Sequence, residues 1–126
     1  MNIAEPVTVG SYNLTGIENI REIVGRLNQS IVLMQNGRDE QIAEILKDIG
    51  EAIIRNPQMD KYACQAAMEI LRNLAWEASL PSAERRLGIV KADLAYMPML
   101  LSTNPDVLNY FEVHQGDLRN FFNISA

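Results

Sequence analysis

Apolar residues recur through the first quarter of the chain at alternating steps of 3 and 4 positions. They are Ile17, Ile20, Val24, Leu27, Ile31 and Met34. This a/d spacing lets one helix bury a narrow apolar seam against another. Thr15-Gly16-Ile17-Glu18 has the form of a capping box, which predicts that the helix begins at Thr15. Asn36-Gly37 predicts its end, because both residues tolerate a positive φ.

Apolar stripes of the same kind predict two more helices. The second begins near Asp39 and ends before Asn56-Pro57, because the residue before a proline is disfavoured in a helix. Its stripe consists of Ile42, Leu46, Ile49 and Ile53. Asp60 is predicted to cap the third helix, whose stripe of smaller residues consists of Ala63, Ala67, Ile70, Leu74 and Ala78. The turn at Asn56-Pro57 predicts a helical hairpin.

Two further helices are predicted in the remainder of the chain. Ser82 opens the fourth, whose stripe consists of Leu87, Val90, Leu94, Met97 and Leu101. Pro98 falls inside that repeat and predicts a kink or a stop near Tyr96. Thr103 is predicted to cap the fifth, which runs through Val107, Phe111, Leu118 and Phe122.

The short connections between these segments favour antiparallel neighbours. We therefore expect an all-α protein, a four- to five-helix up-and-down antiparallel bundle. Residues 15–126 form this single domain. Residues 1–14 contain Pro6, Gly10 and the alternation Val7-Thr8-Val9, which predicts an extended N-terminal arm.

Length and composition fit one cytoplasmic domain. A chain of 126 residues buries enough surface to fold without staples, and its single cysteine, Cys64, lies in an apolar run that suits a small buried residue. The first ten residues lack a basic region followed by an apolar core, so no secretory signal is predicted. No apolar run approaches the roughly 20 residues that span a bilayer. The net charge of −5 is spread along the chain, which argues against nucleic acid as a ligand.

No constellation of residues predicts catalysis, a cofactor or a metal ion. One His and one Cys are too few for a zinc site, and there is no nucleophile elbow and no glycine-rich phosphate loop. His114 has only Tyr110 and Asp117 within one helical turn. We predict a protein that is not an enzyme. An enzymatic or small-ligand bundle that uses His114, Tyr110 or Arg86 is the third hypothesis.

Two helices offer candidate interaction residues. Ile23 and Leu33 lie beside the a/d row of the first helix, which then carries more apolar surface than one antiparallel neighbour covers. Glu40, Glu44 and Asp48 follow one another at four-residue steps on the second helix, and Glu51 extends the row. An acidic face of this kind binds a basic partner or is simply solvated.

Trp76, the only tryptophan, lies one turn after Arg72. A tryptophan beside an arginine is common at contact hot spots, but a lone tryptophan also anchors many small cores, and both interpretations stay open. Arg85, Arg86 and Lys91 make the fourth helix the basic element. They bind phosphate or an acidic protein surface, or they pair with neighbouring helices.

The stretch from Ile42 to Leu87 resembles a helical hairpin found in many uncharacterised bacterial, notably cyanobacterial, proteins. The shared elements are an Ile/Leu-rich helix, a break like Asn56-Pro57-Gln58-Met59-Asp60, an alanine-rich helix ending in Leu74-Ala75-Trp76-Glu77-Ala78, and a fresh cap before Glu84-Arg85-Arg86. The preceding Gly10-Ser11-Tyr12-Asn13-Leu14-Thr15 is also similar to the extended leader that such proteins often carry. The resemblance implies an accessory or oligomerising helical region and transfers no function to individual residues.

The leading hypothesis is a helical module for protein–protein interaction that associates with itself as a homodimer, through the surplus apolar surface of the first helix. The alternative is a small acidic inhibitor, immunity protein or chaperone-like adaptor that docks on a larger protein partner through the acidic face. Neither hypothesis involves nucleic acid or a membrane.

Overall fold

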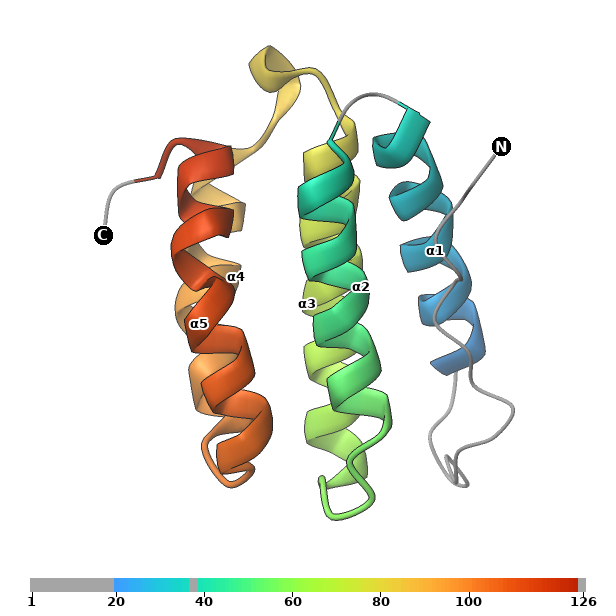
Figure 1. The fold of residues 1–126 in the computed structure, drawn as a ribbon, viewed down its shortest axis with the longest axis vertical. Helices are drawn as coiled ribbons and strands as arrows, with labels where there is room; N and C mark the ends of the chain where they lie inside the picture. Colours follow the sequence, from blue (N-terminus) through green and yellow to red (C-terminus); the bar gives the residue numbers. More distant parts are fainter. Residues whose placement is uncertain (1–19, 37–38, 125–126) are drawn as a thin grey trace.

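The computed structural model describes residues 20–36 and 39–124, and this part of the chain is a bundle of helices (Figure 1). The α-helices are α1 (Ile20–Asn36), α2 (Glu40–Ile54), α3 (Lys61–Ser79), α4 (Leu87–Leu101) and α5 (Pro105–Phe122), and a short 3₁₀ helix, η1 (Ser82–Glu84), precedes α4. The predicted all-α antiparallel bundle is confirmed. The extended arm over residues 1–14, the capping box at Thr15 and the seam residue Ile17 lie outside the described residues.

Helices α2 to α5 form two layers, and α1 lies along one side of them. In Figure 1, α2 and α5 lie in front, with α3 behind α2 and α4 behind α5. Helix α1 packs against both α2 and α3, on the side away from α4 and α5. The first helix therefore has two neighbours within the chain rather than one.

This arrangement buries the seam of α1. Its described members are at most 4% exposed: Ile20, Val24, Leu27, Ile31 and Met34. Ile23 is also buried, at 3%, so the expectation that it adds surplus apolar surface is wrong. Contact with two helices requires a wider apolar stripe than an a/d seam, and Ile23 supplies the extra width. Leu33 stays 56% exposed.

The stripes of α2, α3 and α5 meet in one core, as predicted. Ile42, Leu46, Ile49 and Ile53 of α2 are buried, as are Val107, Phe111, Leu118 and Phe122 of α5. Asp60 caps α3 by accepting hydrogen bonds from the backbone N–H groups of Tyr62 and Ala63, both at 3.0 Å. The cap of α5 is Asn104 and not Thr103, so that prediction is wrong by one residue.

The start of α4 differs from the prediction. Ser82 begins the 3₁₀ turn, and the α-helix starts only at Leu87, which is 41% exposed rather than part of the core. The helix continues through Pro98 to Leu101, which excludes a stop near Tyr96, whereas a kink at this point stays a prediction. A proline removes one backbone donor, and the buried neighbours Leu94, Met97 and Leu101 hold the helix against α3 and α5 across that gap.

The contacts of Arg85 with the end of α3 account for the late start of α4 at Leu87. Its guanidinium donates to the carbonyls of Glu77, Ala78 and Leu80 at 3.0–3.1 Å, which satisfies acceptors that the end of α3 leaves free. The same group lies 4.5 Å from the ring centroid of Phe121 in α5. One side chain thereby ties the end of α3 to the end of α5.

Candidate functional site

A groove of about 720 Å³ runs between α1 and α3. Six of its lining residues come from α1 and three from α3: Glu22, Gly25, Arg26, Gln29, Ser30 and Leu33, then Arg72, Asn73 and Trp76. The α1 residues span three turns of helix, or about 16 Å at 1.5 Å per residue. The groove is therefore long enough to hold a short segment of another chain.

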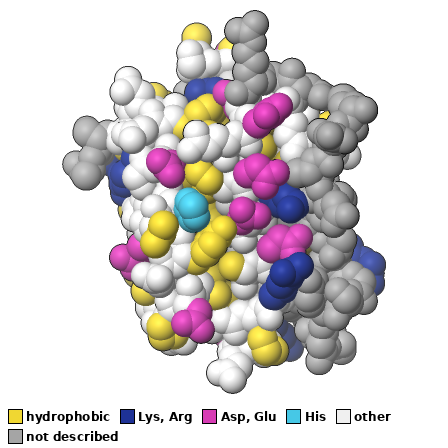
Figure 2. Space-filling model, in the orientation of Figure 1, with side chains coloured by type: hydrophobic (Ala, Val, Ile, Leu, Met, Phe, Trp, Pro, Cys, Tyr) yellow, Lys and Arg dark blue, Asp and Glu magenta, His cyan; other side chains and the backbone are white. Residues whose placement is uncertain are grey.

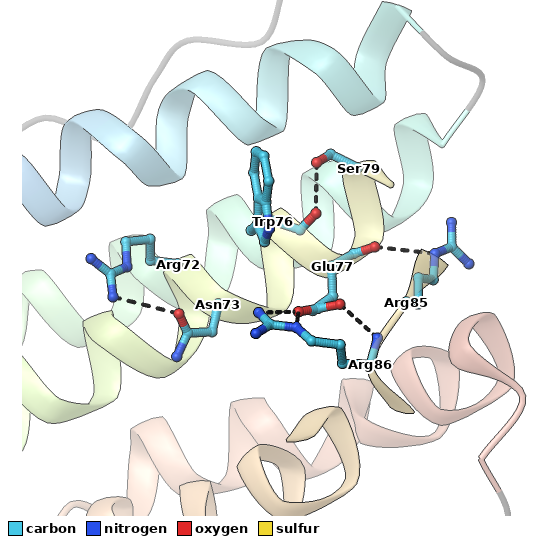
Figure 3. A network of polar contacts seen from close by, with 7 residues as sticks. All are labelled: Arg72, Asn73, Trp76, Glu77, Ser79, Arg85 and Arg86. Atoms are coloured by element: carbon cyan, nitrogen blue, oxygen red, sulfur yellow. Dashed lines mark hydrogen bonds and ion pairs between the residues drawn. The ribbon is translucent and has the colours of Figure 1, made fainter. Parts of the chain in front are cut away.

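The groove collects three of the candidate residues found in the sequence. Trp76 projects from α3 toward α1, away from the polar network on the other side of α3 (Figure 3). Its side chain is 49% exposed, so it does not anchor the core. Leu33 lines the groove from α1 and Arg72 lines it one turn from Trp76. The sequence paired Trp76 with Arg72 and identified Leu33 separately, and the packing of α1 on α3 brings all three together.

The groove carries a local positive charge on an acidic protein. Glu22 and Arg26 form an ion pair at 3.0 Å and neutralise each other. The half-buried Arg72 has no carboxylate partner among the ion pairs of the described residues, and its side chain donates a long 3.5 Å hydrogen bond to Asn73. An acidic group on a ligand would give this guanidinium a stronger partner.

Gly25 leaves room within the groove. A methyl group added at this position would meet no atom within 4 Å, although the residue lies in the middle of α1. Glycine costs a helix roughly 1 kcal/mol relative to alanine. Nothing in the packing of the described residues requires glycine here, and its absence of a side chain keeps this part of the groove open.

The acidic candidates on α2 lie elsewhere, on the face shown in Figure 2, where acidic side chains gather over α2. Glu40 and Glu44 are exposed. The pKa of Tyr110 in α5 is raised by burial, then by its interaction with Asp48 and by the charge of Glu44. Glu51 pairs with Arg55 at 3.0 Å. Glu51 is thus paired within the chain, whereas Glu40 and Glu44 stay exposed on this face.

The residues of the enzymatic hypothesis do not form a shared site. Arg86 is held by Glu77 at the start of α4, whereas Tyr110 and His114 lie together on α5 with ring centroids 4.9 Å apart. A second hollow, of about 480 Å³, lies between the α2–α3 and α4–α5 turns and includes Tyr110 but neither His114 nor Arg86. Within residues 20–36 and 39–124, no three His, Cys, Asp or Glu side chains are grouped to hold a metal ion.

The sequence reasoning missed the outward face of α4. Ile89, Tyr96 and Met99 are 42%, 48% and 68% exposed, and Ala92 and Ala95 between them are also exposed. The signal was present, because apolar residues occupy both the inward and the outward face of α4, with Lys91 and Asp93 as its charged residues, and an apolar helix face is normally covered. No helix in the described part of the chain, α4 included, is long and apolar enough to cross a membrane.

Comparison with known proteins returns no match to any family model, any curated protein or any solved structure. The resemblance to bacterial helical hairpins stays a prediction.

Proposed function

We propose that this chain is a non-enzymatic protein-interaction module, and that the groove between α1 and α3 receives a helical segment of its partner. The observation that carries the proposal is the exposure of Trp76 and Leu33 on one groove. A large aromatic side chain is costly to leave half in water, and tryptophan and arginine are both enriched at binding hot spots.

The partner segment is an amphipathic helix with an apolar stripe and at least one carboxylate. The apolar stripe covers Trp76 and Leu33, and the carboxylate pairs with Arg72. Helix-in-groove recognition uses anchors spaced over two to four turns, which suits the three turns of α1 that line the groove. The charge favours an acidic segment, in contrast to the basic partner expected from the acidic face of α2.

A peptide selection tests this proposal. A phage library of helical 16-residue peptides is selected on the wild-type protein. The selected peptides are then measured against Gly25→Gln, which places a side chain in the groove at a position where an added Cβ meets nothing within 4 Å. Gly116→Gln is the matched control, because Gly116 is also helical, exposed and open. Selected peptides should carry Asp or Glu beside an apolar stripe, and Gly25→Gln should weaken them by about 10-fold or more while Gly116→Gln leaves them unchanged.

Two results would overturn the proposal. One is a set of selected peptides that bind Gly25→Gln as well as they bind the wild type. The other is a selection that yields no peptide with a preference for this protein over an unrelated helical bundle.

A further inference from the structure

The outward face of α4 has the spacing of a helix-pairing seam. Ile89, Ala92, Tyr96 and Met99 follow one another at steps of 3, 4 and 3, the a/d pattern, while the inward face of the same helix is already buried in the core. Helix α4 thus carries two apolar faces. One packs against α3 and α5, and the other has no neighbour within the described part of the chain.

We propose that a second copy of this chain covers this face, with the two α4 helices packed antiparallel around a two-fold axis level with Leu94. In that register Ile89 faces Met99 of the second copy, and Ala92 faces Tyr96 of the second copy. Each small residue then lies opposite a large one, which is the arrangement that fills an interface without voids. The pairing is isologous, as most dimer interfaces are.

The parallel alternative fits this face poorly. In a parallel pair each residue faces its own counterpart, so the two Tyr96 rings compete for one layer and the two Ala92 residues leave a gap in the next. Antiparallel packing removes both problems. The small residues at positions 88, 92 and 95 allow close approach, and a methyl group added to Gly88 would meet nothing within 4 Å in one chain alone.

Charge also favours the antiparallel pair. The first half of α4 carries the exposed Lys91, Arg86 at its start is paired with Glu77, and the last turn has no basic residue. Antiparallel packing places the basic end of each helix beside the C-terminal end of the other, where free carbonyls carry partial negative charge. Lys91 is the only charged residue among the exposed positions from 87 to 99, so the face offers little to a strongly charged partner and suits its own copy.

Sedimentation velocity at micromolar concentration tests the dimer. The wild type should sediment with about twice the 14.2 kDa chain mass. Ala92→Lys should raise the dimer dissociation constant ~100-fold or more, since it buries an unpaired charge twice. Ala92 is exposed in the single chain, so the circular dichroism spectrum of Ala92→Lys should match that of the wild type. Val113→Lys, at a 66% exposed apolar residue of α5, is the control and should remain dimeric.

Mixing two variants tests the register. Ala92→Lys and Tyr96→Glu should each be monomeric alone. Their equimolar mixture should form a heterodimer, because the introduced lysine of one chain then faces the introduced glutamate of the other. A wild type that stays at the monomer mass, a dimer that survives Ala92→Lys, or a mixture that fails to associate would each overturn the inference. These measurements do not involve the α1–α3 groove, so they can fail while the proposed function stands.

Discussion

Glu77 is fully buried at the end of α3, and Arg86 binds its carboxylate through both backbone and side chain. The backbone N–H of Arg86 donates to Oε1 at 2.8 Å, and its Nε donates to Oε2 at 2.6 Å (Figure 3). The guanidinium is 59% exposed. The buried charge therefore has a solvated partner that also fixes where α4 begins.

Substitution of Arg86 should lower the stability of the protein more than substitution of Glu77. Arg86→Met leaves a buried carboxylate with one backbone donor, and we expect the free energy of unfolding to fall by about 3 kcal/mol. Glu77→Gln leaves the arginine in contact with water and should cost only about 1 kcal/mol. Urea denaturation followed by circular dichroism measures both. The double variant should be more stable than Arg86→Met alone, and an equal loss in the two single variants would contradict this account of the pair.

The raised pKa of Asp93 predicts that the stability of the protein depends on pH. The pKa of this carboxyl group is raised by burial and by the charge of Glu77, against the opposing effect of Arg86, and one of its oxygens has no hydrogen-bond partner in the described structure. A raised pKa means that the folded chain holds this proton more tightly than the unfolded chain. The ionised carboxylate therefore lowers stability above the raised pKa, and the loss disappears as the pH falls below the ordinary aspartate value of about 3.9.

Asp93→Asn should accordingly stabilise the protein at pH 7 and lose that advantage in acid. Urea denaturation at several pH values measures the difference between variant and wild type. Glu69→Gln, at an exposed position of α3, controls for the loss of one negative charge. A difference that stays constant with pH would show that ionisation of Asp93 is not the cause.

Cys64 should be inert in the folded protein. It is 4% exposed, and burial raises the pKa of its thiol to about 11. Because the thiolate is the reactive form, alkylation by iodoacetamide at neutral pH should be at least ~100-fold slower in buffer than in denaturing urea. Mass spectrometry over time measures both rates. Equal rates would mean that α3 opens readily around this residue.

The sequence predicted the helices and most of the core because burial in a bundle follows helical periodicity. The stripes of α2 and α5 show this, and so does the cap at Asp60. Periodicity does not reveal which helices become neighbours. Ile23 was therefore misplaced, and the shared groove of Leu33 and Trp76 could not be foreseen.

The start of α4 differs from the prediction for a related reason. Ser82 has the chemistry of a cap, but Arg85 and Arg86 bind groups of α3 that become their neighbours only after the chain folds back. Pro98 likewise predicts a kink or a helix end when local rules are applied alone. Tertiary contacts of Leu94, Met97 and Leu101 with the core keep the helix intact past this proline.

Trp76 permits the most direct measurement of the central claim, which is that the α1–α3 groove binds a helical segment of a partner. It is the only tryptophan, so its indole N–H gives a single resolved signal in a ¹H–¹⁵N spectrum of the labelled chain. Titration with a selected acidic peptide should shift this signal and saturate with the same dissociation constant as the bulk binding, and Gly25→Gln should abolish the shift. A peptide that binds while the Trp76 signal stays in place would contradict the claim.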